Sequence, residues 1–97
     1  MSYDVVITEH LRITILRLLE ETPSRVFNES ILLDKVERYG FAPSRDRLRT
    51  ELRWLEEQGL VNLAGEACLV ATLTERGEDV ARCRVMVPGV KRPSPRR

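Results

Sequence analysis

The sequence predicts a small α+β domain, mainly α with one short β-hairpin, in the order helix-helix-helix-strand-strand-helix. Apolar residues recur at helical spacing before residue 59, as Leu48, Leu52 and Leu55 illustrate. After Gly59 the pattern changes to short apolar runs on either side of a glycine-containing turn, which is typical of a hairpin. A chain of 97 residues with 42% hydrophobic side chains fits one compact domain with a small core.

The first helix is predicted over about residues 8–21. Its apolar stripe consists of Leu11, Ile15, Leu18 and Leu19. Ile13 and Leu16 widen this stripe, and a helix with so broad an apolar surface usually contacts more than one neighbour. We therefore expect it to contact the domain core and, in a homodimer, a second subunit. The last helix is an alternative or additional dimer contact.

The second helix is predicted between two end signals. Asn28 is a favourable N-cap, Glu29 suits the positive end of the helix, and Gly40 is a C-terminal stop. Apolar residues at helical spacing then define the side of the helix that faces the core. The expected buried residues are Ile31, Leu32, Val36 and Tyr39.

The third helix is predicted over about residues 44–58. Pro43 separates it from the second helix, Ser44 is suited to cap it, and Gly59 ends it. Two helices joined by so short a connection fit a helix-turn-helix. Trp54 lies beside the leucine stripe, and we expect it to fill a gap in the core rather than to form an exposed anchor for a partner.

The hairpin is predicted to consist of strands at residues 60–63 and 68–73. Gly65 lies in the turn between them, where it can adopt a positive φ. Thr74 is then a favourable N-cap for a last helix. The inner face of that helix is expected to contain Val80 and Ala81.

The charged residues are distributed unevenly along the chain. Sixteen Lys and Arg residues against 15 Asp and Glu give a net charge of +1, although residues 91–97 alone contain four basic residues and no acid. The rest is slightly acidic, which is a poor match to the strongly basic surface typical of DNA-binding proteins. We expect a domain at residues 1–86 and a basic, proline-containing disordered tail at residues 87–97, because prolines and charges of one sign cannot build a core.

The residues that catalytic and metal sites need are sparse. Cys68 and Cys83 have no histidine or further cysteine at metal-ligand spacing, and we expect them to be small, reduced, buried residues. His10 has no nearby partner, and no glycine-rich phosphate loop or nucleophile-elbow serine is present. We therefore expect no enzyme, no cofactor, no metal and no small-molecule site. The absence of a membrane-length apolar run and of signal-peptide features favours a cytoplasmic protein.

The order of these elements resembles the winged-helix superfamily, most strongly from Ser44 to Ala81. Residues 48–61 (LRTELRWLEEQGLV) resemble a bacterial recognition helix that runs into its wing. Residues 73–81 (LTERGEDVA) resemble the segment after the wing in MarR-, PadR- and ArsR-type regulators. The compact chain with a basic tail is also similar to small phage-encoded regulators. The resemblance implies a homodimeric transcriptional regulator that binds double-stranded DNA.

The polar side of the third helix is the expected DNA-reading surface. In the usual docking, the N-terminal half of this helix enters the major groove, where arginine binds guanine edges or phosphate and threonine reaches a base edge. The candidate residues are Ser44, Arg45, Arg47, Arg49, Thr50 and Arg53. Basic residues of the tail can add phosphate contacts. They are Lys91, Arg92, Arg96 and Arg97.

Two features favour an alternative, a winged helix that serves as a protein-interaction module, for instance in a phage assembly, and does not bind DNA. The third helix carries as many acids as bases, and the pairs Arg47–Glu51 and Arg53–Glu57 lie at i,i+4, where they can neutralise each other. The wing tip carries Glu66 and no base, and an acid close to phosphate is unfavourable. If Arg49 and Arg53 are paired with acids or buried against a second subunit, the DNA-reading function is disfavoured.

Overall fold

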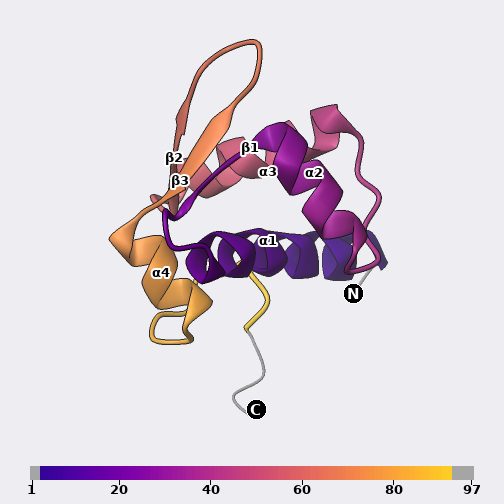
Figure 1. The fold of residues 1–97 in the computed structure, drawn as a ribbon. Helices are drawn as coiled ribbons and strands as arrows, with labels where there is room; N and C mark the ends of the chain where they lie inside the picture. The colour runs from indigo at the N-terminus through magenta and orange to yellow at the C-terminus, as the bar shows by residue number, and fades with distance from the viewer. Residues whose placement is uncertain (1–2, 93–97) are drawn as a thin grey trace.

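The computed structural model describes residues 3–92, which form four helices and a three-stranded sheet (Figure 1). The helices are α1 (Tyr3–Glu21), α2 (Glu29–Glu37), α3 (Arg45–Glu57) and α4 (Glu75–Ala81). The strands are β1 (Val26–Asn28), β2 (Val61–Ala64) and β3 (Val70–Leu73). The α+β class and the predicted order of elements are confirmed, with strand β1 as an addition. None of these helices is long and apolar enough to cross a membrane.

Strand β1 gives the hairpin a third strand that the sequence did not predict. The sheet has the order β1-β3-β2 with antiparallel pairs, so that Ala71 of β3 lies opposite Phe27 on one side and Leu63 on the other. Because β1 is only three residues long and ends at Asn28, the residue that caps α2, no alternation of apolar and polar residues marks it as a strand. The pairing fixes the start of α2 beside the hairpin.

Helix α1 is the centre of the fold. Figure 1 shows α2, α3 and the hairpin on one side of α1 and α4 beside its C-terminal end. Ile13 and Leu16, which widen the apolar stripe, are only 5% and 0% exposed. Since α1 contacts α2, α4 and β3 of its own chain, the breadth of this stripe is accounted for without a second subunit.

The buried face of α2 is narrower than expected. Leu32 and Val36 are fully buried, whereas Ile31 and Tyr39 are 40% and 58% exposed. The helix ends at Glu37, so Tyr39 lies beyond it and no longer follows its period. Ile31 lies roughly 100° around the helix from Leu32 and therefore faces away from the core. The expectation that Ile31 and Tyr39 are buried was wrong.

The predicted N-terminal ends of α2, α3 and α4 are confirmed by their hydrogen bonds. Helix α1 begins at Tyr3 rather than at about residue 8, and α2 ends at Glu37, before the stop expected at Gly40. Each N-cap side chain accepts a bond from the backbone N–H three residues later, at 2.8 Å for Asn28, 3.0 Å for Ser44 and 2.9 Å for Thr74. Gly59, after the end of α3, and Gly65, in the wing turn, have φ values of 78° and 90°. Both lie in the left-handed region that glycine adopts without strain.

The folded chain extends beyond the boundary expected at residue 86. Val87 is only 6% exposed and belongs to the core, and the backbone N–H of Lys91 donates to the carbonyl of Glu9 on α1 at 3.2 Å. Residues 87–92 therefore lie on the domain, and the expected tail is corrected to this extent. Residues 93–97 lie outside the described range.

Candidate nucleic-acid interface

The predicted contact residues of α3 differ in exposure. The half-buried ones are Arg47 and Arg49, and the exposed ones are Ser44, Arg45, Thr50 and Arg53. Thr50 Oγ1 donates to the backbone of its own helix at 3.0 Å. Arg53 forms no ion pair with any residue in the range 3–92, so the expected pair with Glu57 does not form there. Thr50 and Arg53 thus keep an outward-facing polar surface.

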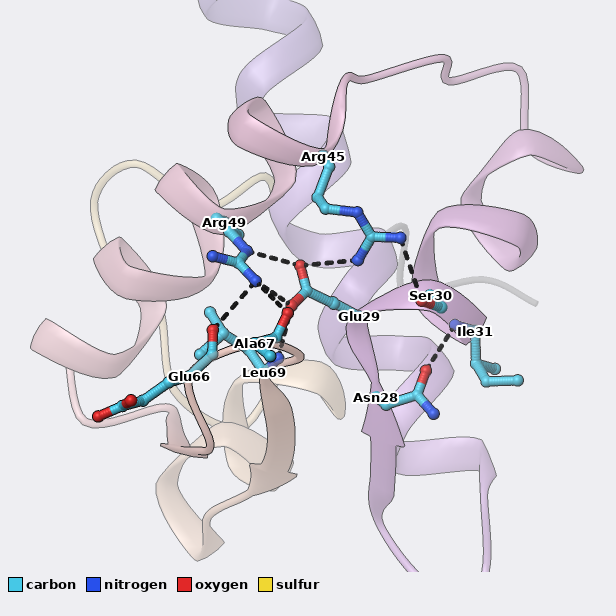
Figure 2. Close-up of polar contacts among 9 residues, drawn as sticks. All are labelled: Asn28, Glu29, Ser30, Ile31, Arg45, Arg49, Glu66, Ala67 and Leu69. Carbon is cyan, nitrogen blue, oxygen red and sulfur yellow. Dashed lines mark hydrogen bonds and ion pairs between the residues drawn. The ribbon is translucent and has the colours of Figure 1, made fainter.

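The buried carboxylate of Glu29 joins α2, α3 and the hairpin (Figure 2). It is fully buried and accepts two hydrogen bonds from the Arg49 guanidinium, both at 2.8 Å. The backbone N–H of Leu69 donates to it at 2.5 Å, and Arg45 Nη1 lies 3.1 Å from Oε1. The bond from Arg49, above all, lowers the pKa of Glu29 from 4.5 to about 2, although burial acts in the opposite direction. Glu29 is therefore ionised at neutral pH.

Arg49 also holds the tip of the wing. Its Nη2 donates to the carbonyl of Ala67 at 2.8 Å and approaches the carbonyl of Glu66 at 3.3 Å (Figure 2). The same guanidinium forms the bidentate bond to Glu29, so most of its donors are engaged within the protein. Arg49 thereby fixes the wing to α3, a structural role that the sequence did not predict.

A second buried carboxylate, Glu51, joins α3 to α1. Glu51 is 4% exposed and binds Arg12 Nε at 2.7 Å and Arg47 Nε at 2.9 Å, so the predicted pair Arg47–Glu51 is confirmed. The Arg12 guanidinium lies 3.7 Å from the centroid of the Trp54 ring, a cation–π contact. Trp54 is half-buried against the core, in agreement with its expected role.

Each buried carboxylate is thus shared by two arginines. Arg45 and Arg49 surround Glu29, and Arg12 and Arg47 surround Glu51. The group around Glu29 retains one net positive charge, whereas Asp4, 3.7 Å from Arg47 Nη1, balances the group around Glu51. The arrangement neutralises part of the basic surface expected on α3 and fixes the remaining guanidinium groups in position.

No local sequence pattern predicted either cluster of charges as a whole. The sequence explained Glu29 only as an acid at the positive N-terminal end of a helix, because its partner Arg49 lies 20 positions further along the chain. Arg12 and Glu51 are separated by 39 positions. Only Arg47–Glu51, at i,i+4, has a spacing that local sequence rules detect.

The wing tip presents an acid and an exposed thiol. Glu66 is exposed, as expected, and it is the only charged residue between β2 and β3. Cys68 is exposed rather than buried, because the loop lets residues 65–68 project from the sheet before Leu69 enters the core. The expectation that both cysteines are buried is therefore wrong for Cys68, while Cys83 is half-buried.

Three helices followed by an antiparallel hairpin, with β1 as its third strand, define this chain as a winged-helix protein. It belongs to the family described as the ribonuclease R winged-helix domain, which it matches over residues 13–80. A solved structure of an hsRosR-S1 complex shares the fold, with a TM-score of 0.65 and 23% identity over 80% of this chain and 70% of that chain. The finer likeness to MarR-, PadR- and ArsR-type regulators stays a prediction.

Two relatives are more similar in sequence. Protein gp26 of Escherichia phage Mu is 49% identical over 94 residues, which cover 94% of this chain and 95% of gp26. A protein of Haemophilus influenzae is 42% identical over 78 residues, 78% of this chain and 76% of its own length. The match to gp26 is consistent with the expected likeness to phage-encoded proteins.

Proposed function

We propose that this winged-helix protein binds double-stranded DNA with the N-terminal half of α3 in the major groove, as a homodimeric transcriptional regulator of the cytoplasm. The observation that carries the proposal is the excess of guanidinium over carboxylate groups at this end of α3, where each buried carboxylate is shared by two arginines. Exposed Arg53 adds a further positive charge, while Asp4 and Asp46 offset part of the excess. A net positive helix face attracts phosphate.

The proposed contacts divide by role. Thr50 and Arg53 read base edges, because both are exposed and Arg53 has no competing ion pair within residues 3–92. Arg45, with 46% of its side chain exposed, binds phosphate while Glu29 holds it in place. Arg47 and Arg49 hold α3 and the wing, and Ser44 caps the helix. These three residues act as positioning residues.

The basic C-terminal residues are left out of this contact surface. Lys91 and Arg92 are exposed where the described chain ends, on the side of α1 opposite the hairpin (Figure 1). Arg96 and Arg97 lie outside the described residues, and their contact with phosphate stays a separate expectation. The proposal therefore depends on α3 alone.

The test is fluorescence anisotropy on duplexes selected from genomic fragments, at low salt, where phosphate contacts are strongest. We expect the native chain to bind and Arg53→Ala to weaken binding about tenfold or more, as the loss of one base contact does. Arg17→Ala is the matched control, because Arg17 is exposed on α1, outside the proposed contact surface, and should leave affinity unchanged. A folded native chain that binds no duplex at low salt overturns the proposal.

The second candidate, a protein-interaction module, is favoured by the acids that α3 and the wing expose. Glu56, Glu57 and Glu66 are all exposed, and three arginines of α3 are paired with carboxylates. Such a surface suits a basic protein partner better than phosphate. This candidate predicts no duplex binding at low salt by a folded chain, so the same anisotropy measurement separates the two functions.

A further inference from the structure

Glu9 of α1, Val80 of α4 and the segment of residues 85–92 line an apolar hollow of about 400 Å³. Its floor includes Val80 and Val87, which are 3% and 6% exposed. Val85, Pro88 and Val90 form its walls. We call this hollow, with the residues at its rim, the terminal patch.

Exposed apolar side chains gather at the terminal patch. Five large apolar side chains are exposed in the described part of the chain, and one of them, Met86 at 66%, lies in the rim. Val5 and Val6, at 43% and 36%, lie four and three residues before the rim residue Glu9, on the same side of α1. Exposed apolar surface concentrated in one place is typical of a protein–protein contact.

The rim carries charges of both signs. Glu9 lies on α1, while Lys91 and Arg92 lie on the segment that crosses it. Within residues 3–92 none of these three side chains forms an ion pair, and Arg92 instead contacts the sulfur of Met86 at 3.5 Å. The charges at the rim are therefore available to a partner.

The presence of both an acid and bases on one apolar patch favours a two-fold contact between identical chains. In such a contact the same patch meets itself, so each charge must find its opposite on the same surface of the other copy. A partner whose surface carried charges of one sign would place a like charge opposite either Glu9 or the two basic residues Lys91 and Arg92. Charge complementarity thus favours a second copy of this chain as the occupant.

We propose that the terminal patch is the homodimer interface, with Glu9 of each copy facing Lys91 and Arg92 of the other around a two-fold axis. This inference rests on the homodimer in the proposed function and relocates its interface. The middle of α1 and the inner face of α4 outside the hollow are unavailable, because Leu16 and Ala81 are buried in their own chain. Docking at the patch leaves the hairpin and the start of α3 uncovered, on the other side of α1 (Figure 1).

Charge reversal tests the interface with two complementary variants. Glu9→Lys makes the rim wholly basic, and the double variant Lys91→Glu/Arg92→Glu makes it wholly acidic. We expect sedimentation velocity over a concentration series to find the native chain as a dimer and each variant at least about tenfold weaker in self-association, because like charges then oppose each other across the axis. An equimolar mixture of the two variants should restore the dimer, since every rim charge again meets its opposite.

Two controls keep the outcome decisive. Glu37→Lys reverses an exposed charge of α2 away from the patch and should dimerise like the native chain, while circular dichroism verifies that each variant is folded. Met86→Asp should weaken the dimer without rescue by mixing, because it removes apolar contact rather than charge pairing. A monomeric native chain, or variants that dimerise as well as it does, overturns the interface. These measurements contain no DNA, so their failure is distinguishable from failure of the duplex assay.

Discussion

Glu29 and Glu51 are ionisable residues in the interior of a small domain, and three of the four arginines that bind them, all but Arg12, were predicted to contact DNA. The bonds to Glu29 reach α2, α3 and the wing, and those to Glu51 reach α1 and α3. A buried carboxylate without its partners is strongly destabilising, whereas an exposed ion pair contributes little. Substitution of these arginines therefore changes folding as well as any binding.

Arg49→Ala should lower the free energy of unfolding clearly more than Arg53→Ala does, because it removes the bidentate partner of the buried Glu29 carboxylate and leaves only Arg45 and the Leu69 N–H to bind it. Urea denaturation followed by circular dichroism measures the change. Arg53→Ala is the matched control on the same helix, and its effect should stay within about 0.5 kcal/mol. Equal, small effects of both substitutions would contradict the structural role of Arg49.

Acid should remove the contribution of Glu29 over a defined pH range. Its pKa in the folded chain is about 2, below the usual 4.5, so its stabilising effect is complete above pH 4.5 and is lost as the pH falls toward 2. Thermal unfolding of the native chain and of Glu29→Gln, measured from neutral pH to pH 2, isolates this contribution. The native chain should lose more stability than the variant across that range. Parallel losses would show that Glu29 keeps its ordinary pKa.

At the scale of elements, the hairpin and α4 meet through a glycine. Gly77 lies in the first turn of α4, and a Cβ placed on it would overlap the carbonyl oxygen of Leu60 and come within 2.7 Å of a Leu73 methyl group. The backbone of α4 at Gly77 therefore contacts the backbone of Leu60 directly. The sequence shows a glycine in a helix, which local propensity alone would read as a weakness.

Gly77→Ala should consequently destabilise the chain by about 1–3 kcal/mol, although alanine is the better helix former. The added methyl group forces α4 away from the backbone of Leu60, the residue immediately before β2. Differential scanning calorimetry should find a lower Tm than for the native chain. Gly40→Ala is the comparison, since its Cβ would meet open space and only its φ of 89° opposes the substitution. A Tm raised by Gly77→Ala would contradict the close contact.

At the scale of the whole molecule, α1 separates two surfaces. The start of α3 and the hairpin lie on one side of it, and the end of the described chain lies on the other (Figure 1). A dimer formed through the terminal patch would therefore leave both α3 helices exposed, one on each copy. Pairing of arginines with Glu29 and Glu51 limits how strongly each of these surfaces attracts phosphate.

The salt dependence of duplex binding should accordingly be modest. Arg45 is the residue of each α3 that is proposed to bind phosphate, so a dimer neutralises two phosphates through α3. The slope of log Kobs against log salt is then about −2, from roughly −0.9 for each neutralised phosphate. Anisotropy titrations at several salt concentrations measure it. A slope near −7 would show that basic residues outside α3 also bind the duplex.

The sequence by itself determined the elements whose signals are local. Capping residues at Asn28, Ser44 and Thr74, leucines at helical spacing and glycine-marked turns were enough for the helices and the hairpin, because these signals act within one or two turns of chain. The outward position of Thr50 and Arg53 followed from the same periodicity. Strand β1 escaped prediction because its partner is distant in sequence.

Only the tertiary structure decided which charges remain available. Glu29 and Arg49 are 20 residues apart and Arg12 and Glu51 are 39 apart, so no local rule predicts that they meet. Their attraction becomes strong only where the folded chain excludes water around them. The same folding buried the wide stripe of α1 within one chain and left the terminal patch exposed. Local periodicity thus fixes which side of a helix faces outward, and long-range contact decides which of its charges are already paired.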